Sequence, residues 1–197
     1  MNLPNKITMV RIFLAVILLV LLIFPFNLCG IEFPTYQVFG SITISLQYIF
    51  AGVIFLVAAV SDFIDGNLAR KHNLVTDFGK VMDAIADKVL VNGVLIVLAC
   101  NGLINVAIPV IIITRDIFVD SIKMVAGSKG KAVGASILGK LKTICMMTGL
   151  TLVFFYNLPF ELLNIDVANG LLYVATVLSI ISGIQYYQVN KEYFKEK

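Results

Sequence analysis

Charge is scarce in this chain of 197 residues, since only 14% of them are Asp, Glu, Lys or Arg. No charged residue occurs between Ile42 and Val60, or between Val89 and Cys100. A soluble domain needs a polar surface to cover its core, and a chain that is 59% hydrophobic does not supply one. The composition therefore argues against a soluble helical bundle and predicts a protein of the lipid bilayer.

Cysteine and histidine are also rare. The three cysteines, Cys29, Cys100 and Cys145, stand far apart, each in or at the edge of an apolar run. This spacing argues against a disulfide framework and against a zinc site, and the one histidine, His72, has no second histidine with which to share a metal. We interpret the cysteines as small buried hydrophobic residues and His72 as a solvated loop residue.

Apolar runs of about 20 residues, the length that crosses a bilayer, recur along the chain. They predict an all-α polytopic membrane protein with about six transmembrane helices, at Ile7–Phe26, Ile42–Ser61, Lys88–Leu103, Val106–Val125, Ile137–Phe155 and Ala168–Tyr187. The first run lacks a small-residue cleavage site, so we expect a true span rather than a signal peptide. No repeat or long linker interrupts the chain, which predicts one membrane domain over residues 1–197.

The basic residues predict the orientation. Most lie near the two termini or in the second and fourth connections between the runs: Lys6, Arg11, Arg70, Lys71, Lys80, Lys129, Lys131, Lys191, Lys195 and Lys197. The other connections contain only acidic charge, at Glu32, Glu161 and Asp166. Because basic residues of short loops stay on the cytosolic side, both termini are expected in the cytosol.

Four aspartates stand where the second and third runs adjoin. Asp62 and Asp65 are three residues apart at the end of one run, and Asp83 and Asp87 are four apart at the start of the next. Each pair therefore shares one helix face. With Gly79 as a helix breaker between the runs, two antiparallel helices are expected to bring the four carboxylates together.

Carboxylates packed closely at a membrane edge must take up protons or bind cations. Their oxygens suit Mg²⁺, Mn²⁺ or Ca²⁺, and bound Mg²⁺ keeps positions for water and substrate phosphate. Nearby, Gly66 and Ala69 allow the close approach of a flat nucleotide, and Arg70 offers a planar cationic fork to a diphosphate. In the alternative interpretation the aspartates cap helices or pair with Arg70, Lys80 and Lys88, which accounts for one or two of them but not four.

The spacing of these residues resembles the signature of the CDP-alcohol phosphatidyltransferase family. The pattern is Asp, two residues, Asp-Gly, two residues, Ala-Arg, eight residues, Gly, three residues, Asp, three residues, Asp. This chain meets it at every position, with Asp62, Asp65, Gly66, Ala69, Arg70, Gly79, Asp83 and Asp87. The resemblance implies transfer of a phosphatidyl group from a CDP-activated lipid to an alcohol, with Mg²⁺ or Mn²⁺ as cofactor and a homodimer as the assembly. It also implies a multi-pass protein of the inner (cytoplasmic) membrane whose active site faces the cytosol, in contact with membrane lipids and with no nucleic-acid partner.

The resemblance also assigns roles to single positions. Asp62, Asp65 and Asp83 are expected to hold the metal, with Asp87 beside it as a further ligand and as the base that accepts the proton of the acceptor hydroxyl. The residues expected to bind the CDP-lipid are Asn5, Thr8, Asp62, Gly66, Ala69, Arg70, Thr76 and Gly79. Metal and Arg70 together would neutralise the charge of the pyrophosphate while CMP leaves.

For the acceptor, Pro4–Arg11 and Gly139–Thr143 resemble the branch that makes phosphatidylglycerophosphate from CDP-diacylglycerol and glycerol 3-phosphate. A phosphorylated acceptor needs cations beside the metal site, for which we expect Arg115, Lys140 and Lys142. The two lysines are two residues apart and cannot share a helix face, so one of them is expected to touch substrate. The alternative for each basic residue is snorkelling to anionic lipid headgroups.

This chain departs from many bacterial members of the branch in having Ala84 where they have Pro and Asp116 where they have Glu. These departures leave three other acceptors open, namely inositol phosphate, serine and phosphatidylglycerol. A different class of function, a divalent-cation transporter, is the remaining alternative, because membrane carboxylates often mark ion paths. It is disfavoured by the expectation that the carboxylates gather at one membrane face and that no acidic residue stands near the middle of a span.

Overall fold

Six long helices make up most of the protein in the computed structural model. The structure describes residues 3–38, 42–71, 77–128, 134 and 136–191. Within these ranges it does not describe the side chains of residues 3–4, 63–71, 77–78 and 80. They are α1 (Leu3–Ile23), α2 (Leu46–Lys71), α3 (Asp77–Cys100), α4 (Ala107–Ser128), α5 (Ile137–Phe154) and α6 (Val167–Asn190). Two short 3₁₀ helices lie in connections, η1 (Phe26–Cys29) and η2 (Phe160–Leu163). The prediction of an all-α protein is confirmed.

The length of these helices suits a bilayer. They contain between 18 and 26 residues, and at 1.5 Å per residue they extend about 27–39 Å, against about 30 Å for the hydrocarbon core. Within the described residues, three helices are long and apolar enough to cross a membrane: Asn5–Ile23, Ile137–Phe154 and Val167–Asn190. A shorter apolar stretch, Leu46–Asp62, lies in α2. The protein is therefore a membrane protein.

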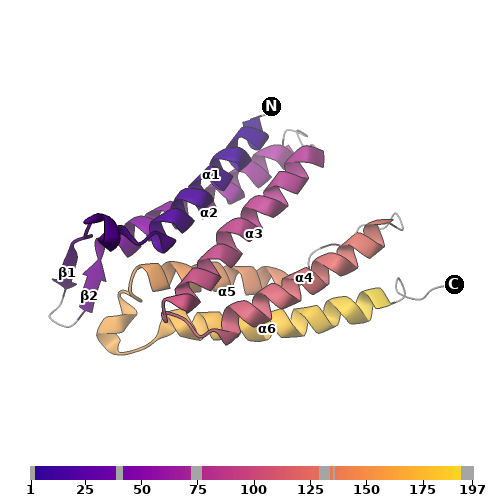
Figure 1. Ribbon diagram of the computed structural model, residues 1–197. Helices are drawn as coiled ribbons and strands as arrows, with labels where there is room; N and C mark the ends of the chain where they lie inside the picture. The colour runs from indigo at the N-terminus through magenta and orange to yellow at the C-terminus, as the bar shows by residue number, and fades with distance from the viewer. Residues whose placement is uncertain (1–2, 39–41, 72–76, 129–133, 135, 192–197) are drawn as a thin grey trace.

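The helices form two bundles that diverge toward one side of the molecule (Figure 1). α1 packs against α2 and α3, while α6 packs against α4 and α5. Contacts of α2 with α5 and of α3 with α4 join the bundles at the other side. On the open side α1 begins, α2 ends, α3 begins, α4 ends, α5 begins and α6 ends. Successive helices thus alternate in direction, as expected for a chain that repeatedly crosses a bilayer.

Close packing at the closed side fixes the two bundles together. Phe55 of α2 and Phe154 of α5 are both fully buried, and their ring centroids lie 5.5 Å apart. Gly52 permits this approach, because a Cβ atom at that position would come within 2.8 Å of the Phe154 Cβ atom. Close-packed interfaces of this kind tolerate little change in side-chain volume, so this contact holds α2 against α5.

The start of the second predicted span is wrong. Ile42–Ser45 is not helical but forms strand β2, which pairs antiparallel with β1 (Thr35–Val38) in the register Thr35 to Ser45. The Ser45 amide donates a hydrogen bond to the Tyr156 hydroxyl at 2.7 Å, which ties the hairpin to the α5–α6 connection. Three consecutive β-branched residues, Ile42, Thr43 and Ile44, favour a strand here, whereas hydropathy alone does not distinguish a strand from a helix.

Helix α3 begins at Asp77, eleven residues before the apolar run predicted as the third span, so Asp83 and Asp87 share a helix as predicted. Gly79 lies in the first turn of this helix and does not break it. These first turns contain four charged residues among hydrophobic ones, so an apolar-run criterion excludes them. The interpretation of the cysteines as buried is wrong for Cys29 and Cys100, which are exposed, whereas Cys145 is partly buried. His72 lies outside the described residues.

Candidate functional site

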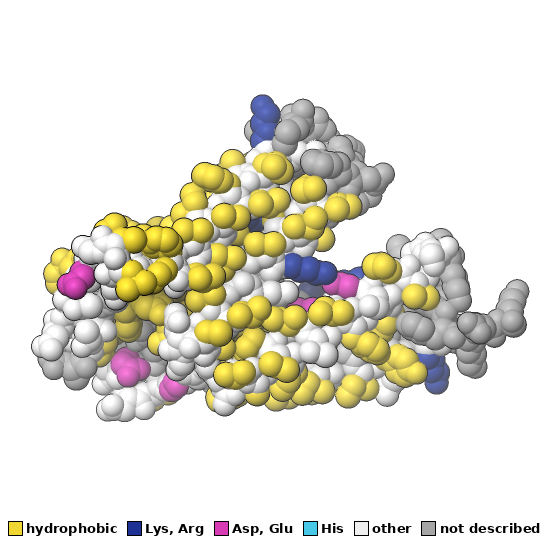
Figure 2. Space-filling view, viewed as in Figure 1, with side chains coloured by type: hydrophobic (Ala, Val, Ile, Leu, Met, Phe, Trp, Pro, Cys, Tyr) yellow, Lys and Arg dark blue, Asp and Glu magenta, His cyan; other side chains and the backbone are white. Residues whose placement is uncertain are grey.

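Basic and acidic side chains gather in the hollow between the two bundles (Figure 2). A cavity of about 250 Å³ opens there, with walls from α3, α4, α5 and α6. Asp87 and Lys88 of α3 line it on one side, and Arg115, Asp116 and Lys142 line it on the other. The cavity thus brings the last of the four aspartates together with Arg115, Lys140 and Lys142, the three basic residues predicted to bind the acceptor.

Two of the aspartates meet one arginine in the first bundle. Arg11 Nη1 of α1 donates to Asp62 Oδ1 of α2, and Arg11 Nη2 donates to Asp83 Oδ1 of α3. The Arg11 side chain is 1% exposed, whereas Asp62 and Asp83 are 49% and 52% exposed. Buried cationic groups need an anionic partner, so Arg11 draws carboxylates from two helices to one point that remains open to solvent.

The donor set at this point fits a hard divalent cation. Carboxylate oxygens are the ligands that Mg²⁺ and Mn²⁺ prefer. Asp62 and Asp83 both pair with Arg11, so their carboxylates lie close together. Asp87 follows Asp83 by one helical turn on α3. Within the described side chains, no group of three or more His, Cys, Asp or Glu residues forms a complete metal cage. The side chain of Asp65, the predicted third ligand, lies outside the described residues.

The residues predicted to bind the CDP-lipid are described in part. Asn5 and Thr8 are buried, at 8% and 4% exposure, on the two turns of α1 that precede Arg11. Gly79 is partly exposed in the first turn of α3. Asn5 and Thr8 therefore lie along one side of α1 that leads to the Arg11 cluster. The remaining predicted positions lie outside the described side chains, namely Gly66, Ala69, Arg70 and Thr76.

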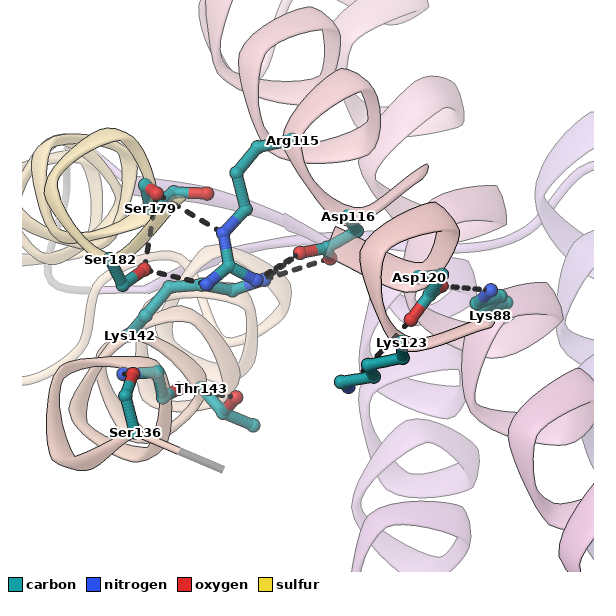
Figure 3. A network of polar contacts seen from close by, with 11 residues as sticks. Lys88, Arg115, Asp116, Asp120, Lys123, Ser136, Lys142, Thr143, Ser179 and Ser182 are labelled. Atoms are coloured by element: carbon teal, nitrogen blue, oxygen red, sulfur yellow. Dashed lines mark hydrogen bonds and ion pairs between the residues drawn. The ribbon is translucent and has the colours of Figure 1, made fainter. Parts of the chain in front are cut away.

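A second cluster lies in the other bundle and joins α4, α5 and α6 (Figure 3). Lys142 Nζ of α5 donates to both Asp116 oxygens of α4 at 2.8 Å. Arg115 Nη1 donates to Asp116 Oδ1 at 3.0 Å. The Lys142 side chain is 5% exposed, that of Arg115 13% and that of Asp116 26%. The three charges together therefore leave an excess of one positive charge beside the cavity.

α6 holds Arg115 in place. Arg115 Nε donates to the Ser179 carbonyl oxygen at 3.1 Å, and Arg115 Nη2 donates to Ser182 Oγ at 2.7 Å. Gly183 lets the side chain lie flat on the helix, since a Cβ atom there would be 3.0 Å from Arg115 Cγ. The guanidinium is thus fixed by two helices, which favours an anion-binding role over a mobile side chain that snorkels to lipid.

The two candidate lysines differ in their surroundings. Lys142 is buried and ion-paired, whereas Lys140 is exposed, although both border the cavity. One turn further along α4, Asp120 forms an ion pair with Lys88 of α3 and a longer one, at 3.7 Å, with Lys123. The Lys88–Asp120 pair crosses the hollow between the bundles (Figure 3).

The sequence patterns do not indicate the contacts of Arg11 and Asp116. Each is a charged residue inside an apolar run, which is itself a signal of function in a membrane protein. The expectation that no acidic residue stands near the middle of a span is wrong, because Asp116 lies near the middle of α4. Asp116 is held between two cations, however, and that arrangement favours anion binding over passage of a cation.

The family model described as CDP-alcohol phosphatidyltransferase matches residues 1–181. The chain belongs to the CDP-alcohol phosphatidyltransferase family. As a member of this family it is an enzyme that transfers phosphatidyl groups, and such enzymes generally use a divalent metal.

Similar family members come from several bacteria. The chain is 36% identical over 194 residues to the CDP-diacylglycerol--glycerol-3-phosphate 3-phosphatidyltransferase of Bacillus subtilis (strain 168). The alignment covers 98% of this chain and 97% of that relative. The chain is 38% identical to the protein of the same name from Mycoplasma genitalium, over 98% of this chain and 86% of the relative. A third relative of that name, from Rickettsia bellii, is 32% identical over 98% of this chain and 97% of its own length.

Proposed function

We propose that this chain transfers the phosphatidyl group of CDP-diacylglycerol to glycerol 3-phosphate, which gives phosphatidylglycerophosphate and CMP. The observation that carries the proposal is the cavity that has Asp87 on one wall and Arg115 with Lys142 on the other. A carboxylate suits the removal of a hydroxyl proton, and two cations suit a phosphate monoester. The names of the bacterial relatives support the same acceptor.

In this proposal the first bundle binds the donor. Asp62, Asp65 and Asp83 hold Mg²⁺ or Mn²⁺, with Asp87 adjacent, and the metal when bound offsets negative charge on the pyrophosphate. The half exposure of Asp62 and Asp83 supports this role, because a substrate phosphate can reach them. The nucleotide and its diphosphate are bound by Asn5, Thr8, Asp62, Gly66, Ala69, Arg70, Thr76 and Gly79.

The second bundle binds the acceptor. Arg115 and Lys142 hold its phosphate through charge-assisted hydrogen bonds, and its hydroxyl is directed toward Asp87 across the cavity. Asp87 accepts the hydroxyl proton while the hydroxyl oxygen forms a bond to the phosphorus that bears the diacylglycerol. The bond from that phosphorus to the bridging oxygen breaks, and CMP leaves with the bridging oxygen and its electron pair.

We further propose that residues 1–197 form a single domain in the inner membrane. All six helices cross the bilayer, both termini and the open side of the molecule face the cytosol, and the protein acts as a homodimer. The alternation of helix directions supports the six crossings. The basic residues near the two termini, in the last turn of α2, in the first turn of α3 and in the α4–α5 connection support the orientation.

An acceptor panel tests the proposed reaction. Purified full-length protein in detergent is mixed with CDP-diacylglycerol and with glycerol 3-phosphate, inositol phosphate, serine or phosphatidylglycerol, and CMP release is measured. We expect release with glycerol 3-phosphate that stops on chelation of divalent metal and returns with Mg²⁺ or Mn²⁺. Preference for another acceptor would overturn the proposed substrate, and acceptor-independent transport of metal into proteoliposomes would favour the transporter instead.

A further inference from the structure

The side chain of Asp116 connects two basic residues that come from different helices. Asp116 Oδ1 accepts hydrogen bonds from both Lys142 Nζ, at 2.8 Å, and Arg115 Nη1, at 3.0 Å. Its second oxygen also faces Lys142 Nζ at 2.8 Å. No role is assigned to Asp116 by the family signature, which ends at Asp87. We infer that Asp116 is a positioning residue for the acceptor phosphate: it holds Arg115 and Lys142 together at the cavity, and this inference rests on the proposed function.

Burial makes such a partner necessary. Lys142 is 5% exposed and Arg115 is 13% exposed, so neither charge is well solvated by water. Two unscreened cations at the same wall of a cavity repel each other, and burying either one without an anion is costly. Asp116 removes this repulsion and still leaves the group with a net charge of +1. The cluster therefore stays folded without substrate and still attracts an anion.

The geometry leaves donors for a ligand. A guanidinium carries five N–H donors and an ammonium carries three. The contacts of Arg115 within the described residues use one donor each on the Ser179 carbonyl oxygen, Ser182 Oγ and Asp116 Oδ1. Lys142 directs its ammonium to Asp116 alone among its described contacts. Both cations can thus keep Asp116 as a partner while they donate further hydrogen bonds to a phosphate monoester in the cavity.

The neighbouring acidic residue on α4 provides a comparison. Asp120 also lines the cavity and also lies between two basic residues, Lys88 and Lys123. Those lysines are 49% and 47% exposed, so water solvates them and the ion pairs contribute little. Loss of the Asp120 charge is therefore expected to matter much less than loss of the Asp116 charge, although both lie on one face of the same helix.

Steady-state CMP release tests the inference, with glycerol 3-phosphate varied at saturating CDP-diacylglycerol and then the reverse. We expect Asp116→Asn to raise the KM for glycerol 3-phosphate roughly 10-fold to 100-fold, which corresponds to the loss of one or two charge-assisted contacts with the acceptor phosphate. The KM for CDP-diacylglycerol should change less than about twofold, since the described hydrogen bonds and ion pairs of Asp116 are all with Arg115 and Lys142 and none is with the first bundle. Asp116→Glu should restore the KM to within about threefold, and Asp120→Asn should change it by about threefold at most.

A double variant shows whether Asp116 acts through its partner. In a Lys142→Met background, Asp116→Asn should cost much less than it does alone, because the cation that it positions is gone. An unchanged KM for glycerol 3-phosphate in Asp116→Asn overturns the inference, and so does an equal loss in both KM values. If Asp116→Asn does not fold, a 10-fold defect in Asp116→Glu overturns it as well.

The wild-type protein separates the inference from the function on which it rests. If it releases CMP with serine and not with glycerol 3-phosphate, the proposed function and the inference both fail. If it prefers inositol phosphate, the proposed acceptor fails, and the same KM comparison with inositol phosphate decides the inference. Activity with glycerol 3-phosphate and an unaltered KM in Asp116→Asn overturns the inference alone.

Discussion

The two lysines at the start of α5 give a matched pair of substitutions. Lys142 is buried against Asp116, whereas Lys140, two residues earlier, is exposed. In Lys142→Gln the side chain keeps a hydrogen-bond donor but loses its charge. A hydrogen bond to a charged group contributes about 1.5–3 kcal/mol, so the KM for glycerol 3-phosphate should rise about 10-fold to 150-fold at 1.4 kcal/mol per factor of ten.

The fold should survive this change. Asp116 keeps Arg115 as a partner at 3.0 Å, so its carboxylate is not left without a cation. Lys140→Gln removes the same charge from a solvated side chain and should change the KM less than about threefold. The assay is CMP release with varied glycerol 3-phosphate, together with thermal unfolding of each variant in detergent. Equal effects of the two substitutions, or a larger effect at Lys140, would refute the assignment of the acceptor site.

Three further predictions concern other parts of the molecule. Arg11→Met leaves the half-exposed Asp62 and Asp83 without their shared cation. It should lower the free energy of unfolding by about 2–3 kcal/mol, which corresponds to a Tm decrease of roughly 5–10 °C. Added Mg²⁺ should raise the Tm of the variant more than that of the wild type, and a variant whose Tm equals that of the wild type would contradict the prediction. Gly183→Ala places a Cβ atom 3.0 Å from Arg115 Cγ and should weaken acceptor binding, whereas the Cβ atom of Gly170→Ala on the same helix meets open space and should not. Equal KM values for glycerol 3-phosphate in the two variants would count against the role of Arg115. In intact cells a membrane-impermeant thiol reagent added outside should label Cys29 and Cys100 but should not label the Lys191→Cys variant at position 191. The opposite labelling pattern would reverse the proposed orientation.

Hydropathy and charge predicted the helices well and their ends poorly. Long apolar runs mark helices directly, because the bilayer requires them. Strand β2 (Ile42–Ser45) was predicted as part of a helix because a segment rich in apolar, β-branched residues meets the same hydropathy criterion as a membrane helix. Helix α3 extends before its apolar run because Asp77–Asp87 mixes hydrophobic residues with four charged ones, and the charged residues end an apolar run without ending a helix. In both places apolar content alone does not locate the end of the helix.

The sequence relates residues of the candidate site to one another only where they form a local pattern. Asp62 and Asp83 belong to a signature of fixed spacing, and the structure brings them to one arginine. Arg11 stands 51 and 72 residues from these partners, and Asp116 stands 26 residues from Lys142. No local spacing connects such residues, so their pairing appears only once the helices are packed.

The central claim is that Asp87 removes the acceptor proton in the cavity between the two bundles. The direct measurement is CMP release by Asp87→Asn in the presence of CDP-diacylglycerol, glycerol 3-phosphate and Mg²⁺, with donor binding followed by the thermal shift that CDP-diacylglycerol produces. We expect turnover to fall about 10²-fold to 10⁴-fold, which is the usual contribution of a positioned base, while the thermal shift stays like that of the wild type. Turnover at the wild-type rate in Asp87→Asn would contradict it.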